Sequence, residues 1–103
     1  MELIIITAVS QFEKDIKHLL KKSGVKSFSY MDVTGYKDLS DQPMEANWFA
    51  SDIGEHRSIL FYAFVQKELI DEFLERIDQL NSGQETASKI HAAVLDIKKT
   101  NKQ

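Results

Sequence analysis

Two apolar stretches decide the fold: LIIITAV at Leu3–Val9 and SILFYAFV at Ser58–Val65. Each is a nearly continuous run of β-branched and aromatic residues, which is typical of a strand buried on both faces. Apolar residues at helical spacing follow each run. We therefore predict two strand-helix-strand units in succession, within one domain that covers all 103 residues.

The first predicted helix carries an apolar stripe at helical spacing: Phe12, Ile16, Leu19 and Leu20. Ser10 and Glu13 match a capping box at its start. Gly24 suits the left-handed residue that ends such a helix. The segment Val25–Thr34 then predicts a second strand, and its interleaved polar residues favour the edge of a sheet.

The second unit repeats this order after Ser58–Val65. A helix is predicted over Lys67–Leu80, with its inner stripe formed by Leu69, Ile70, Phe73, Leu74, Ile77 and Leu80. A fourth strand is predicted over Lys89–Ile97. The remaining residues, 98–103, form a polar tail that we expect to be frayed.

Right-handed connections place both helices of such a chain on the same face of one sheet. The expected fold is α+β and ferredoxin-like, βαββαβ, with a four-stranded antiparallel sheet whose central strands are Leu3–Val9 and Ser58–Val65. Both faces of these strands are apolar, but the helices cover only one face. An exposed apolar face of this size predicts a homo-oligomer. The alternative is a sparsely apolar outer face, because a one-residue slip exchanges the faces.

Composition and motifs exclude several functions. A net charge of −3 and a pI of about 5.5 disfavour nucleic-acid binding. The absence of cysteine excludes thiol chemistry and fits the cytoplasm. The N-terminal apolar run is too short for a signal peptide or for direct membrane insertion. No Gly-x-Ser-x-Gly, P-loop or Gly-x-Gly-x-x-Gly is present, so we expect a protein that is not an enzyme.

A long polar insert, residues 35–57, separates the two units and holds the only Trp and the only Pro. Connections of this length inside a small domain are usually functional. We expect its ends to extend the flanking strands as a protruding ribbon. Asn47, Trp48 and Phe49 are the candidate partner-binding residues, because large aromatics on a polar protrusion often anchor contacts. The alternative is that Trp48 and Phe49 pack against their own or a neighbouring subunit.

The same insert holds the best candidate metal ligands. His56 lies beside Glu55 and near Asp52, and imidazole with carboxylates suits zinc. The alternative is a solvated acidic loop that resists aggregation.

Five segments resemble the P-II-like superfamily, the trimeric signalling proteins of nitrogen regulation and their relatives. They are Glu2–Ile6 as the first strand, Phe12–Gly24 as the first helix, Asp32–Tyr36 as the lead into a T-loop, Leu69–Phe73 in the second helix, and Lys89-Ile90 at the start of the last strand. Together with the order of elements, the resemblance covers nearly the whole chain.

The resemblance implies a homotrimer with inward-facing sheets, a small effector bound in clefts between subunits, and a T-loop that engages a transporter or another regulated protein. It places Gly35, Tyr36 and Lys37 at the base of the T-loop. It also places Gly83 and Lys89 near an anion in the cleft. These five residues are therefore the candidate effector-binding set.

The chain departs from the family at the glycine-rich Thr-Gly-x-x-Gly-Asp-Gly-Lys loop. Here the segment runs from Asn81 to Lys89, and only Gly83 and Lys89 match. Glycines allow a backbone to approach a phosphate closely, so the phosphate-binding residues are largely missing. The cofactor is therefore unknown, although an adenine nucleotide stays a candidate. The family's C-terminal arginine pair and its modifiable tyrosine are absent, so uridylylation is not expected.

Two alternative functions remain open. The first is a CutA-like metal-binding trimer linked to heavy-metal tolerance or efflux, in which His56, Asp52 and Glu55 bind the metal. The second is a small dimeric αβ-barrel enzyme with its chemistry in a cavity behind the sheet. The stoichiometry of the assembly distinguishes this dimer from either trimer.

Overall fold

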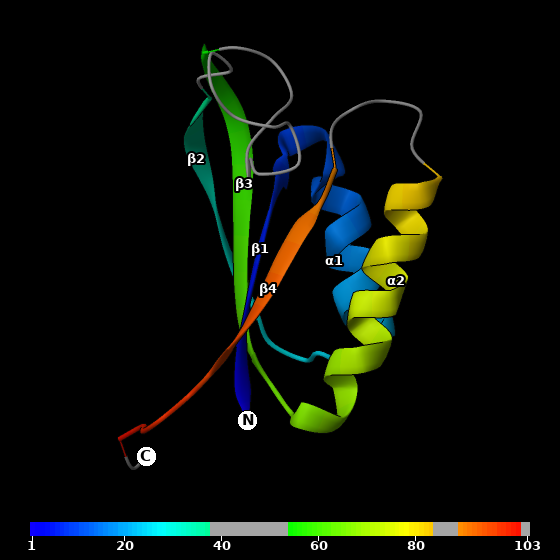
Figure 1. Cartoon of the computed structure of the whole chain (residues 1–103), viewed down its shortest axis with the longest axis vertical. Helices are drawn as coiled ribbons and strands as arrows, with labels where there is room; N and C mark the ends of the chain where they lie inside the picture. The colour runs from blue at the N-terminus through cyan, green and yellow to red at the C-terminus, as the bar shows by residue number, and fades with distance from the viewer. Residues whose placement is uncertain (38–53, 84–88, 102–103) are drawn as a thin grey trace.

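The structure, a computed structural model, describes residues 1–37, 54–83 and 89–101 (Figure 1). Of residues 37 and 54–56 it describes the backbone alone. The elements follow the predicted order: β1 (Glu2–Val9), η1 (Ser10–Phe12), α1 (Glu13–Lys22), β2 (Ser29–Lys37), β3 (Gly54–Val65), η3 (Lys67–Leu69), α2 (Ile70–Ser82) and β4 (His91–Asp96).

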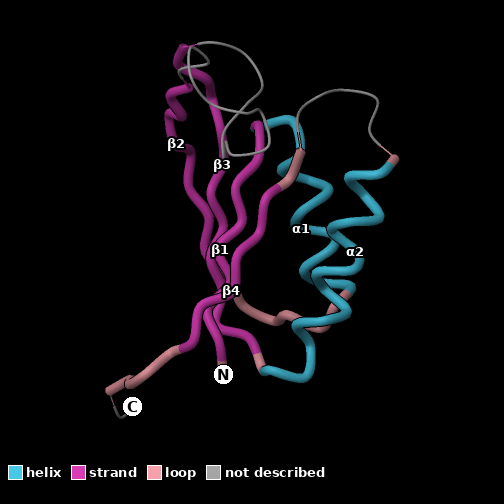
Figure 2. The backbone as a smooth tube through the Cα atoms, viewed as in Figure 1, coloured by secondary structure: helices cyan, strands magenta, loops and turns pink. Residues whose placement is uncertain are grey.

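The four strands form one antiparallel sheet in the order β2-β3-β1-β4. The two most apolar strands, β1 and β3, are therefore central, as predicted. Both helices lie on the same side of the sheet, side by side (Figures 1 and 2). The ferredoxin-like α+β fold expected from the sequence is confirmed.

The core fills the space between the sheet and the helices. Alternate residues of β1, Ile4, Ile6 and Ala8, are at most 2% exposed, and Phe61 of β3 and Phe73 of α2 are fully buried. The remaining buried apolar side chains are Phe12, Ile16, Leu19, Leu20, Val25, Ile59, Ala63, Val65, Ile70, Ile77 and Ile90. The buried core contains all four residues of the first predicted helical stripe and three of the six residues of the second, because residues three and four apart share one face of a helix.

The opposite face of the sheet, here called the outer face, is also apolar. The strand register aligns Leu3 with Phe64 and Leu95 across three strands, and the row above it aligns Ile5 with Tyr62 and Ala93. Phe64 is 55% exposed and Leu95 is 44% exposed. Among the described residues no helix covers this face (Figure 2). The alternative of a sparsely apolar outer face is therefore wrong.

The ends of the long insert extend the sheet as a two-stranded ribbon. Pairing between β2 and β3 continues past Thr34↔Arg57 to Lys37↔Gly54, several residues beyond the predicted strand ends. The ribbon rises above the other strands (Figure 1). The prediction that the insert prolongs both flanking strands is confirmed for its two ends.

Helix α1 begins differently from the prediction. Residues Ser10–Phe12 form a 3-10 turn, and no side chain caps either this turn or α1. The carboxylate of Glu13 instead accepts a hydrogen bond from Lys17, one turn along the helix. The predicted capping box is therefore wrong. The prediction that Gly24 adopts a left-handed conformation after the helix is confirmed, because its φ is 88°.

Candidate functional site

A polar cavity of about 240 Å³ lies at the base of the ribbon, lined by Ser10, Asp32, Val33, Thr34 and Arg57. The strand register explains how these residues meet. Thr34 and Arg57 are directly paired across β2 and β3, and Asp32 lies two residues before Thr34 on the same face of β2. Ser10 joins them from η1, which directly follows β1.

The cavity combines groups of opposite hydrogen-bonding character. The guanidinium of Arg57 supplies donors only, the carboxyl oxygens of Asp32 supply acceptors, and the hydroxyls of Ser10 and Thr34 can do both. Such a set can hold a ligand that carries an anionic group beside a hydrogen-bond donor. Asp32, Thr34 and Arg57 are exposed in the single chain, so a ligand can reach them.

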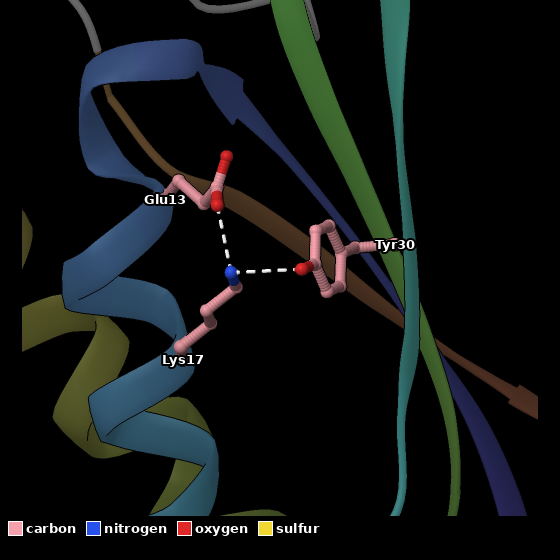
Figure 3. A network of polar contacts seen from close by, with 3 residues as sticks. All are labelled: Glu13, Lys17 and Tyr30. Carbon is pink, nitrogen blue, oxygen red and sulfur yellow. Dashed lines mark hydrogen bonds and ion pairs between the residues drawn. The ribbon is translucent and has the colours of Figure 1, made fainter.

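A second polar group joins α1 to β2, the strand that also lines the cavity (Figure 3). The Lys17 ammonium donates to Glu13 Oε2 at 2.7 Å and to the Tyr30 hydroxyl at 2.9 Å. Tyr30 lies two residues before Asp32 on β2, so both face the helix layer. The contact ties α1 to the edge strand that leads into the ribbon.

This contact shifts the pKa of Lys17. The hydrogen bond to Glu13, followed by that to Tyr30, stabilises the charged ammonium and raises the pKa above its ordinary value of 10.5. The contacts of the charged ammonium therefore stabilise the fold fully when the pH is below the ordinary pKa of the lysine. This stabilisation is lost as the pH rises through the higher pKa of the folded state.

We therefore expect the Lys17→Met variant to be less stable than the parent at about pH 8, with a difference that shrinks as the pH rises past the ordinary lysine pKa of 10.5. Urea unfolding at one pH below and one pH above this value measures the difference. Lys14→Met, which removes an exposed lysine from the same helix, is the matched control and should cost less at the lower pH. An equal loss for Lys17→Met at both pH values would contradict the assignment.

The predicted effector-binding residues occupy two places. Gly35 is buried and Tyr36 is 67% exposed in the ribbon, while the backbone of Lys37 ends β2. Lys89 lies just before β4, on the opposite edge of the sheet, and Gly83 directly follows α2. Three strand spacings of roughly 4.8 Å, about 14 Å in all, separate β2 from β4, so one copy does not bring the two groups together.

Asn81 organises the edge at β4. Its side-chain amide donates to the carbonyl of Ile90 at 2.8 Å and accepts from the amide of Ile90 at 2.8 Å. Lys89 Nζ also donates to the carbonyl of Asn81 at 3.1 Å. These three bonds, here called the Asn81 clasp, join the end of α2 to the residues just before β4.

Several predicted site residues lie outside the part of the chain that the structure describes. The partner-binding candidates Asn47, Trp48 and Phe49, and the metal candidate Asp52, lie outside the described residues. The backbones of Glu55 and His56 pair with Tyr36 and Gly35 in the ribbon, but their side chains are also outside the description. Among the described side chains no group of three or more His, Cys, Asp or Glu could hold a metal ion.

Sequence reasoning misses four residues of the cavity as site residues: Ser10, Asp32, Thr34 and Arg57. It assigns Ser10 to a helix cap, and it uses Asp32 and Thr34 only as part of a resembling segment. Their period-two spacing on an edge strand is the available signal, because it places both polar side chains on one face. The pairing of Arg57 with Thr34 depends on the register of a long ribbon, which no local pattern reveals.

Comparison with known proteins supports the fold. No family model matches the chain, and no curated protein matches it significantly in sequence. Among solved structures it resembles CPII, a nitrogen regulatory PII-like protein from Thiomonas intermedia K12 that was solved bound to ADP, AMP and bicarbonate. The TM-score is 0.63 at 15% identity, over 97% of this chain and 94% of that one.

Two further solved structures are similar. A putative PII-like signalling protein from Thermus thermophilus matches with a TM-score of 0.60 at 20% identity, over 90% of this chain and 82% of that one. A DUF3240 family protein from Shewanella baltica matches with a TM-score of 0.68 at 13% identity, over 99% and 94%. The chain therefore has the fold of the PII-like signalling proteins, and the resemblance predicted from the sequence is confirmed at the level of the fold.

Within the described part of the chain, neither α1 nor α2 has the length and apolar character that crossing a bilayer requires.

Proposed function

We propose that this chain is a divergent P-II-like signalling protein. It assembles as a homotrimer, binds a small effector between subunits, and engages a partner through residues 38–53. The observation that carries the proposal is the polar cavity at the base of the ribbon, because a ligand there would contact the two strands that lead into the insert.

The outer face of the sheet supports self-assembly. Phe64, Leu95 and Met31 on this face are 55%, 44% and 48% exposed, and Leu3, Ile5, Leu60 and Tyr62 are half-buried between them. Monomeric proteins seldom expose so continuous an apolar surface. A second and third copy of the same face would cover it. The three-fold count rests on the similarity to PII-like proteins.

The size of the cavity supports a site that neighbouring copies complete. About 240 Å³ is below the roughly 300 Å³ at which typical small-molecule pockets begin. The other candidate residues lie elsewhere: Lys89 just before β4 on the opposite edge of the sheet, and Gly83 at the end of α2. In the proposed trimer the β4 edge of one copy approaches the β2 edge of the next, so both sets would face one cleft.

The effector is proposed to be anionic. Arg57 supplies a fixed positive charge, and Asp32 with the two hydroxyls selects a ligand that also donates hydrogen bonds. An adenine nucleotide and bicarbonate are the first candidates, since the Thiomonas protein was solved with such ligands. The glycine-poor segment before Lys89 argues against tight phosphate binding.

An effector regulates the insert only if it binds one state of the insert more tightly than another. Its contacts with Thr34 and Arg57 would act on the ribbon, and through it on the candidate contact residues Asn47, Trp48 and Phe49. A membrane transporter or another regulated protein is the proposed partner.

Calorimetry with ADP, AMP, ATP and bicarbonate tests this function. We expect one of these ligands to bind the parent, and Arg57→Gln to weaken that binding roughly tenfold through loss of a charge-assisted contact. Lys67→Gln, which removes an exposed charge at the other end of the fold, is the control and should bind as the parent does. Unchanged affinity in Arg57→Gln, or no binding of any of the four by the parent, would count against the proposed site.

The CutA-like alternative depends on His56, Asp52 and Glu55, and no described contact favours it. Zinc and copper calorimetry on the parent and on His56→Ala distinguishes it from the signalling function.

A further inference from the structure

We propose that the groove between α1 and α2 binds a short-chain monocarboxylate, whose carboxylate is held by Arg76 and Lys22. The groove has a volume of about 440 Å³, and its polar lining comes from Asp15, His18 and Lys22 on α1 and from Arg76 and Gln79 on α2. This volume falls in the roughly 300–1,000 Å³ range of small-molecule sites. None of these residues takes part in the cavity at the ribbon or in the outer face.

The groove lies on the helix layer, on the side of the sheet opposite the outer face (Figure 1). It is therefore not part of the sheet face through which assembly is proposed. The chain runs away from the ribbon along α1 and back toward it along α2, so the two helices are antiparallel (Figure 1). This order sets Arg76 toward the Lys22 end of the groove and leaves Asp15 at the other end.

Arg76 is incompletely paired. Its Nη2 donates to Glu72 Oε1 at 2.6 Å, but its Nη1 is shielded from solvent and has no hydrogen-bond acceptor among the described residues. The side chain is 24% exposed where it lines the groove. Leaving a charged donor shielded and unpaired costs free energy. A ligand carboxylate that reaches the guanidinium from the groove would supply the missing acceptor.

The planar guanidinium matches a carboxylate in a two-bond arrangement, which a single ammonium cannot do. Lys22 adds a second positive charge from the last turn of α1. These two cations define the anionic end of the site, and the amide of Gln79 offers a further donor to the bound oxygen atoms.

The rest of the groove determines what the carboxylate is attached to. Leu19 and Leu80 contribute apolar surface, which suits a short hydrocarbon chain. Asp15, at the far end, would repel a second carboxylate. The site therefore favours a monocarboxylate over a dicarboxylate of the same length.

Butyrate is the probe, and its neutral isostere butyramide is the chemical control. In a titration followed by backbone amide NMR shifts, we expect butyrate to perturb residues of α1 and α2 that line the groove, and butyramide to bind much more weakly. Arg76→Gln should weaken butyrate binding roughly tenfold, and Lys22→Gln should weaken it by a smaller factor. Lys21→Gln, which removes the adjacent charge outside the groove lining, should leave the affinity unchanged.

Two variants separate ligand binding from a merely structural role of Arg76. Glu72→Gln breaks the ion pair but frees the guanidinium, so it should keep or strengthen butyrate binding. Asp15→Asn should remove the preference for butyrate over succinate. Lys22→Gln and Asp15→Asn do not alter the Arg76–Glu72 pair. Butyrate binding by these two variants therefore still tests the proposal if Arg76→Gln fails to fold.

The proposal is overturned if the parent does not bind butyrate, or if butyramide binds as tightly as butyrate. It is also overturned if Arg76→Gln and Lys22→Gln bind butyrate with the affinity of the parent. Arg57→Gln, which tests the ribbon cavity, should leave butyrate binding unchanged. The two sites can therefore fail independently.

Discussion

Replacement of Phe73 by alanine is expected to lower the free energy of unfolding by about 3–5 kcal/mol, the usual cost of removing a buried aromatic ring. Phe73 is 0% exposed on the inner face of α2, within the single core between the helices and the sheet. Domains of this kind are stable by only about 5–15 kcal/mol, so this loss takes a large share of the total. Urea unfolding followed by far-UV circular dichroism measures it.

Leu74→Ala is the matched control for this experiment. Leu74 is the next residue of the same helix and packs only partly against the core, so its loss should cost clearly less. Both variants must be compared at one protein concentration, because assembly adds to apparent stability by mass action. Equal losses at the two positions would show that the core is not centred on Phe73.

A lysine at Phe64 is expected to dissociate the assembly into single copies while the fold is retained. Phe64 is 55% exposed in one copy, so the single chain can accommodate the charge. In an assembly through the outer face, the ammonium would be buried without a partner, which is strongly unfavourable. Native mass spectrometry and sedimentation at micromolar concentration report the number of copies.

Gln66→Lys serves as the control for the Phe64 variant. Gln66 is an exposed polar residue just beyond the end of β3, so the added charge is the same but the apolar face is intact. We expect this variant to assemble as the parent does. A parent that sediments as a single copy, or a Phe64→Lys variant that keeps its partners, would refute assembly through this face.

The centre of the fold was predictable because its signal is local and strong. The runs at Leu3–Val9 and Ser58–Val65 are apolar enough to identify the central strands, and the helical stripes identify what covers them. The boundaries of the outer strands were less predictable. Val25 has the composition of a strand residue, yet it is a buried link between α1 and β2, which begins at Ser29.

The start of β4 shows why such boundaries depend on tertiary contacts. The sequence predicts a strand from Lys89, but β4 begins at His91. The side chain of Asn81 occupies both the amide and the carbonyl of Ile90, the groups that a neighbouring strand would otherwise use. An asparagine nine residues earlier is not a signal that strand propensity contains.

The candidate site was only partly predictable for the same reason. Resemblance alone directed attention to Gly35 and Tyr36, and both lie in the ribbon close to the cavity. The residues that line the cavity come from η1, β2 and β3, and the ribbon register brings them together. Arg76 was equally hidden, because its unpaired nitrogen becomes evident only when the helices are packed.

The Asn81 clasp has a consequence for how this chain can vary. It fastens the end of α2 to the residues before β4, so the connection between them begins and ends at positions that are already fixed to each other. Residues added to or removed from that connection need not disturb the register of β4. Changes in its length should therefore cost folding only the small entropy of closing a longer loop, and its chemistry can vary at this end of the sheet while the scaffold stays the same.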